Sequence, residues 1–201
     1  MVKRVCLSVL CCLMAVPFMA AGMDSCFFQM PQALLPGISV NTRKDMVDFF
    51  THNRPAVGRT AFAAETELTA FSADLLTLKT SASSQIQVKR LTIGTKEVFA
   101  WIHTVFGPYP NSVLSFYHTD WTPCTDVEMQ KPTCLDFFDE QAAGEILAKR
   151  FEAECTRLFV EMWFESGQKV LHLRSNMLSD LPDEWLSPFL PFIKTEITKE
   201  F

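Results

Sequence analysis

Residues 97–121, EVFAWIHTVFGPYPNSVLSFYHTDW, decide the fold of this chain. Two runs rich in β-branched and aromatic residues flank Gly107-Pro108-Tyr109-Pro110, a combination typical of a β-hairpin. Each run is apolar at both odd and even positions, so both strands are expected to be central in a sheet and covered on both faces. The hairpin predicts architecture and contains no catalytic motif.

The region from Glu65 onward alternates apolar and polar residues with a period of about two, and short polar turns separate its runs. Short links join antiparallel neighbours, so this region predicts a β-meander. The expected strands are 65–71, 75–80, 84–93, 96–106 and 111–121. Within the third of these, Ile86 and Val88 share one face but Leu91 lies on the other, which predicts a bulge near Lys89-Arg90.

Helical segments are expected on both sides of the meander. Residues 24–52 predict two short helices separated by Pro36-Gly37, and the later helical patterns cover 136–150 and a short stretch from Pro182. A second hairpin and a final edge strand are predicted over 158–164, 169–174 and 195–201. The fold class is therefore α+β, an antiparallel meander with an N-terminal helical segment and one or two later helices packed on it.

The first residues have the pattern of a secretory signal peptide. Lys3 and Arg4 precede the apolar run Val5 to Val16, and small residues stand at Ala20-Ala21-Gly22. We therefore expect residues 1–22 to be a signal peptide, residues 23–201 to form one α+β domain, and the protein to be exported to the periplasm or secreted. Later runs are too short to cross a membrane, so no transmembrane segment is expected in the mature chain.

The charge balance argues against nucleic acid as a partner. Removing Lys3 and Arg4 with the signal leaves 16 basic against 23 acidic residues, a net charge of −7. A net acidic chain without a basic cluster has no electrostatic footprint for phosphate backbones or anionic lipid.

Four cysteines remain after the expected cleavage: Cys26, Cys124, Cys134 and Cys155. Four thiols in an oxidising compartment allow three full pairings. Cys124 and Cys134 bracket a short polar loop and are the favoured pair, ahead of Cys26–Cys155. The alternative is that all four are buried or free thiols.

One polar cluster follows from the leading hairpin. If its loop is residues 107–110 and the register is symmetric, Glu97 faces Asp120 and Phe99 faces His118. Two opposed carboxylates beside an imidazole can raise a carboxyl pKa or hold a cation, so Glu97, His118 and Asp120 are the candidate catalytic residues. The alternative is that both acids are solvated strand ends, which a one-residue slip would separate.

No linear motif predicts a metal, a cofactor or a nucleophile. The histidines lie singly at His52, His103, His118 and His172, and no cysteine pair has the spacing of a redox motif. Phosphate-binding glycine loops and a serine nucleophile elbow are also absent from the sequence. No metal site and no cofactor are therefore expected.

Several motifs resemble an uncharacterised family of exported proteins from Gram-negative anaerobic bacteria, described only as a domain of unknown function. The matching elements are Phe27-Phe28-x-Met30-Pro31, Leu34-Leu35-Pro36, Arg43-x-Asp45-Met46-x-Asp48-Phe49, Phe106-Gly107, Phe116-Tyr117-x-x-Asp120-Trp121 and Leu190-Pro191. The resemblance implies an envelope or secreted protein and supplies no activity or site. Arg43 has two interpretations: it clamps a partner's carboxylate, or it pairs with Asp45 and Asp48 on a solvated face.

The preferred function is a non-catalytic exported envelope protein that binds a protein, peptide or glycan partner. Trp101, Phe116, Tyr117 and Trp121 could line its groove, although such residues more often form core. The rival is an exported hydrolase whose acid and histidine residues assemble only in space.

Overall fold

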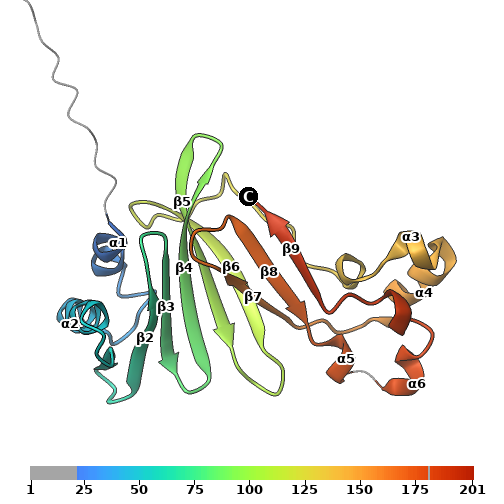
Figure 1. Cartoon of the computed structure of the whole chain (residues 1–201), viewed down its shortest axis with the longest axis horizontal. Coiled ribbons are helices and arrows are strands. Elements are labelled where there is room, and N and C mark those ends of the chain that lie inside the picture. The colour runs from blue at the N-terminus through green and yellow to red at the C-terminus, as the bar shows by residue number, and fades with distance from the viewer. Residues whose placement is uncertain (1–21, 181) are drawn as a thin grey trace, which may run out of the picture.

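The computed structural model describes residues 22–180 and 182–201, so the expected signal peptide lies outside the described residues except for Gly22. The fold is α+β, as predicted, and is built on a six-stranded antiparallel meander in chain order (Figure 1). Its strands are β1 (Val57–Arg59), β2 (Glu65–Phe71), β3 (Leu75–Ser81), β4 (Ser84–Ile93), β5 (Lys96–Val105) and β6 (Asn111–His118). A second sheet contains β7 (Val160–Phe164), β8 (Val170–Ser175) and β9 (Glu196–Glu200).

The helices flank the two sheets. In the described residues they are α1 (Met23–Gln29), α2 (Val40–Thr51), α3 (Glu140–Ala143), α4 (Glu145–Glu154), α5 (Met177–Asp180) and α6 (Asp183–Leu186), with 3₁₀ turns at Cys134–Phe137 and Leu190–Phe192. The Ser39 side chain caps α2 by accepting a hydrogen bond from the Thr42 N–H. No helix of the described residues is both long and apolar enough to span a membrane.

Two hydrophobic cores lie on opposite faces of the meander. One face packs against α1 and α2 through a core that includes Phe27, Met46 and Val88. The other face packs against the small sheet and α4, with Ile102 and Phe151 fully buried. Burial on both faces explains why the sequence of this region is apolar at odd and even positions.

The structure corrects three sequence predictions about the strands. Strand β4 pairs regularly with β3 and β5 across Lys89 and Arg90, so the expected bulge is wrong there. Its apolar phase changes because Val88 faces one core and Leu91 the other. Register shifts occur instead in β2, at Leu68, and at the end of β3. Strand β6 is the last strand of the sheet rather than a central one, and the three-residue β1 was not predicted.

Strand β7 lies across the face of the meander and is fixed there by polar side chains. The Gln87 amide accepts from the Phe164 N–H at 2.6 Å and donates to the Phe164 carbonyl at 3.2 Å. The hydroxyl of Ser112 accepts from the Met162 N–H at 2.9 Å. These side chains satisfy backbone groups on the β7 edge, which would otherwise be buried without partners.

A buried ion pair also joins the two sheets. Lys89 is 1% exposed, and its ammonium group pairs with the Asp74 carboxylate and donates to the Glu165 carbonyl at 2.8 Å. The Asp74 carboxylate also accepts from the Gly167 N–H at 3.0 Å, so the turn between β7 and β8 is bound to the turn between β2 and β3. Burial acts to raise the pKa of Asp74, but these hydrogen bonds outweigh it and lower the pKa to about 2.

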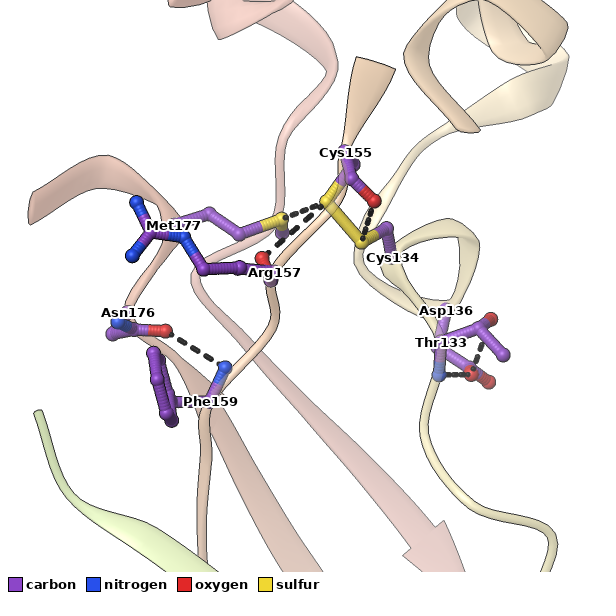
Figure 2. The surroundings of a disulfide bond; sticks show 8 residues. All are labelled: Thr133, Cys134, Asp136, Cys155, Arg157, Phe159, Asn176 and Met177. Atoms are coloured by element: carbon purple, nitrogen blue, oxygen red, sulfur yellow. Dashed lines mark hydrogen bonds between the residues drawn. A yellow bond between two sulfur atoms is a disulfide. The ribbon is translucent and has the colours of Figure 1, made fainter. Parts of the chain in front are cut away.

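A disulfide joins Cys134 and Cys155 at the two ends of the segment that carries α3 and α4 (Figure 2). The predicted Cys124–Cys134 pair is wrong, because Cys134 is bonded to Cys155 and Cys124 is a buried free thiol beside the edge of β6, where its N–H bonds to the Phe116 carbonyl. Cys26 is also a buried free thiol, so the less favoured Cys26–Cys155 pair is not formed either. Proximity in sequence did not predict proximity in the folded chain.

We expect removal of this disulfide to lower the free energy of unfolding. The bond closes a loop with a sequence separation of 21 residues, and cross-linking a loop of that size stabilises by about 3 kcal/mol in the chain-entropy model. The Cys134→Ala/Cys155→Ala double variant should show that loss in urea denaturation. Non-reducing peptide mapping should recover the Cys134 and Cys155 peptides linked, and a linked peptide containing Cys124 would contradict the pairing.

Candidate functional site

The three predicted catalytic residues do not assemble. The hairpin pairs Val98 with His118 and Phe99 with Tyr117, one residue away from the predicted register. Glu97 therefore lies on the opposite face of the sheet from His118 and pairs with Arg90 at 3.1 Å. Asp120 lies beyond the end of β6, where its carboxylate accepts hydrogen bonds from the hydroxyl and the N–H of Thr122. These two hydrogen bonds lower the pKa of Asp120.

The register differs because the hairpin loop is longer than expected. Val105 pairs with Asn111, so the loop comprises the five residues 106–110 rather than the four residues 107–110. Phe106 is apolar and looks like a strand residue in the sequence, and its N–H bonds to the Ser83 carbonyl as a continuation of the β4–β5 pairing, but no residue of β6 pairs with it. A slip of one residue moves every side chain to the other face.

A pocket of about 460 Å³ lies on the meander face that also carries α1 and α2. Trp101 and His103 of β5 contribute to its lining, and so does Ser84, the first residue of β4. The remaining lining residues come from the segment after α1, from the turn between β1 and β2, and from β3 and β4: Ala33, Leu34, Leu35, Pro36, Ile38, Thr60, Phe62, Ala64, Thr80 and Ile86. No described lining residue is an acid, a lysine or an arginine.

The polar groups of the pocket form one short chain of contacts. His103 Nε2 lies 2.8 Å from Ser84 Oγ, and the Thr80 hydroxyl donates to Ser84 Oγ at 3.0 Å. The Trp101 ring packs against the His103 ring with centroids 5.5 Å apart. The buried indole Nε1 of Trp101 has no hydrogen-bond partner among the residues that the structure describes.

An exposed aromatic residue stands at the rim of this pocket. Phe62 is 78% exposed, which is unusual for a phenyl ring, and it occupies the turn between β1 and β2. Its ring lies against Gly37, where the backbone φ of +79° and the nearby ring both disfavour any side chain. Ala61 N donates to the Gly37 carbonyl at 2.7 Å, which holds the turn in place.

The predicted aromatic set is divided between the two faces of the sheet. Trp101, Tyr117 and Trp121 form a row on the pocket face, with the Tyr117 ring 6.4 Å from Trp101 and 5.7 Å from Trp121. Phe116 belongs to the opposite core. Only Trp101 of this set lines the pocket, and burial raises the pKa of Tyr117.

Arg43 has a structural role that neither sequence interpretation named. It is 1% exposed, and its guanidinium donates to the carbonyls of Phe27, Met30 and Ile38. The buried guanidinium thereby binds the end of α1 and the segment that forms one wall of the pocket. Burial lowers the pKa of Arg43.

The site is suited to binding rather than to acid–base chemistry between carboxylates. It offers an aromatic wall, an exposed phenyl rim, three hydroxyls and a free indole N–H, which together suit a sugar ring or an apolar side chain. No local sequence pattern predicts this pocket, because its residues come from five separate segments between positions 33 and 103. The sequence signal for the pocket was the spacing of Trp101 and His103, which lie two residues apart and therefore on the same face of β5.

The fold and this pocket define a class: an α+β protein with an antiparallel meander that is covered on both faces and a site lined by aromatic, apolar and hydroxyl side chains. The chain belongs to the family described as protein of unknown function DUF3256, whose model matches residues 15–199. It is similar to a solved structure of a domain of an uncharacterized protein from Porphyromonas gingivalis W83, at 20% sequence identity and a TM-score of 0.71. The likeness covers 90% of this chain and 96% of that one, and it shows the fold alone. No curated protein matches this chain.

Proposed function

We propose that this chain is a non-catalytic exported envelope protein of a Gram-negative anaerobe that binds a protein, peptide or glycan partner through the Trp101 pocket. The observation that carries the proposal is the buried, unpartnered indole N–H of Trp101 in a pocket that is otherwise aromatic, apolar and hydroxylic. A ligand hydroxyl or carbonyl would complete that hydrogen bond, while its apolar face stacks on the ring.

Export is supported by the basic and apolar pattern at the start of the chain and by the Cys134–Cys155 disulfide. Disulfides persist in oxidising compartments such as the periplasm and the cell exterior. Mass spectrometry of protein recovered outside the cytoplasm should find an N-terminus near Met23, and retention of residues 1–22 would contradict the proposal.

We expect the Trp101→Ala variant to lose binding to the probe that the native protein selects from a panel of soluble glycans and short peptides. Loss of aromatic stacking and of the indole donor should raise the dissociation constant, measured by calorimetry, at least about tenfold. The Trp163→Ala variant is the matched control, because Trp163 also packs on a histidine, His172, but lies in the small sheet. Equal affinities of native protein and Trp101→Ala would refute the pocket as the binding site.

The rival function is an exported hydrolase, and one contact favours it. The 2.8 Å separation of Ser84 Oγ and His103 Nε2 is the distance at which a histidine activates a serine nucleophile. A Ser84→Ala variant separates the two functions, since a hydrolase would lose turnover of ester substrates entirely. A binding protein would keep its ligand affinity within a few fold and show no turnover in either form.

A further inference from the structure

The outer edge of the meander offers unpaired backbone groups at one end of β6. At the other end, Cys124 N donates to the Phe116 carbonyl and His118 N donates to the Thr122 carbonyl, both at 2.9 Å. The backbone N–H and C=O groups of successive residues in an antiparallel strand point alternately to the two neighbouring strand positions. The groups of Ser112 and Leu114 therefore point away from β5, as those of Phe116 and His118 do. Within residues 22–180 and 182–201, no backbone hydrogen bond outside the sheet ladders involves these groups.

The chain itself begins to cover this edge and then leaves it. Pro123 forms an antiparallel bridge with Tyr117, and continuation in that register would place Asp126 opposite Leu114. Instead, the Asp126 carboxylate pairs with Lys96 at 2.6 Å. Lys96 begins β5 and lies beyond His118, at the end of β6 that is far from Ser112 and Leu114. The line that a next strand would follow is therefore left open beside Ser112 and Leu114.

A groove of about 630 Å³ runs along this open line. One side is β6 from Ser112 to Tyr117, and the other is the irregular segment that includes Val127, Met129 and Pro132. Its apolar lining includes Leu114, Phe116 and Met162, which belong to or pack on the larger core. Glu128 and Lys131 also line the groove, which therefore carries one acidic and one basic side chain.

We propose that this groove binds an extended peptide segment of a partner protein, which adds antiparallel to β6 at Ser112 and Leu114 and places alternate apolar side chains against Leu114, Met129 and Met162. Ser112 and Leu114 each supply one donor and one acceptor to the peptide backbone, as in other cases of strand addition. The unpaired backbone groups specify an extended polypeptide rather than a glycan or a lipid. This edge groove shares no lining residue with the Trp101 pocket, so the inference stands independently of the proposed function.

Amide hydrogen exchange tests the proposal with the native protein and the soluble probe acetyl-Lys-Thr-Val-Thr-Val-Thr-Lys-amide. At a probe concentration of about 5 mM, exchange of the Ser112 and Leu114 amides should slow at least about fivefold. The amides of Val113 and Ser115 already bond to β5 and should keep their rates. Unchanged exchange at both Ser112 and Leu114 would overturn the proposal, as would protection confined to residues of the Trp101 pocket.

N-methylated probes provide the matched control for strand pairing. Adjacent residues of an extended peptide point their N–H groups to opposite edges, so methylation of the valines and methylation of the threonines block different edges. One methylated probe should lose the protection of Ser112 and Leu114, and the other should keep it. Loss with both probes or with neither would show that backbone pairing is not the mode of binding. The Trp101→Ala variant should respond to the unmethylated probe as the native protein does.

Discussion

Replacement of Arg43 by methionine should lower the free energy of unfolding by roughly 4 kcal/mol, because several buried carbonyls then lose their donor. The guanidinium donates to Phe27 O at 3.1 Å and, through two nitrogens, to Ile38 O at 3.1 and 3.2 Å. No other side chain of the described segments donates to these two carbonyls. Urea denaturation followed by far-UV circular dichroism measures the loss.

The Arg43→Lys variant shows whether charge alone is sufficient. An ammonium group cannot reach carbonyls on two sides as a guanidinium fork does, so we expect it to recover less than half of the loss. Lys44→Met is the matched control on the neighbouring, exposed position, and it should change stability by less than about 0.5 kcal/mol. Full stability of Arg43→Met would refute the structural role of Arg43.

Replacement of Lys89 by methionine should cost about 3 kcal/mol, because it leaves the Asp74 carboxylate and the Glu165 carbonyl without their buried cation. Lys79→Met is the matched control, since Lys79 is exposed on β3 and pairs with Glu67 at 3.7 Å. Equal losses in the two variants would contradict a special role for the buried pair.

The same pair predicts the response to acid. The pKa of Asp74 is about 2 in the folded protein, below its ordinary value of 3.8, so ionised Asp74 stabilises the fold fully above about pH 4. That contribution, roughly 2 kcal/mol, is lost as the pH falls from about 4 towards 2. Unfolding measured across that range should show a shallower dependence in Lys89→Met, because hydrogen bonding from Lys89 helps to lower the pKa. An unchanged slope would contradict this assignment.

The strands could be predicted because their alternation follows from burial of their faces. Strand β2 agrees with its prediction at both ends, and β4 does so as well. The predicted strand ends and pairing were wrong where the local sequence suits both a strand and a loop, because tertiary packing then decides between the two. Phe106 suits a strand or a loop, and the register follows from Val105 pairing with Asn111, which leaves Phe106 without a partner in β6.

The candidate site was less predictable than the fold. Glu97 and His118 became candidates through a register that was one residue out, and a change of one residue places them on opposite faces. Arg43 was noted in the sequence, but its carbonyl partners depend on the path of the chain between α1 and α2. The Trp101 pocket needs Phe62, from the turn between β1 and β2, and Ser84, at the start of β4, to lie beside Trp101, and no local pattern specifies this arrangement.

The most direct test of the Trp101 pocket is a nuclear magnetic resonance titration of the four tryptophan indole N–H signals with the selected glycan or peptide. The Trp101 indole proton should shift downfield as it gains an acceptor, while the signals of Trp163 and Trp185 stay in place. Saturation of the protein with no shift at Trp101, or with shifts confined to Trp163 or Trp185, would contradict the account.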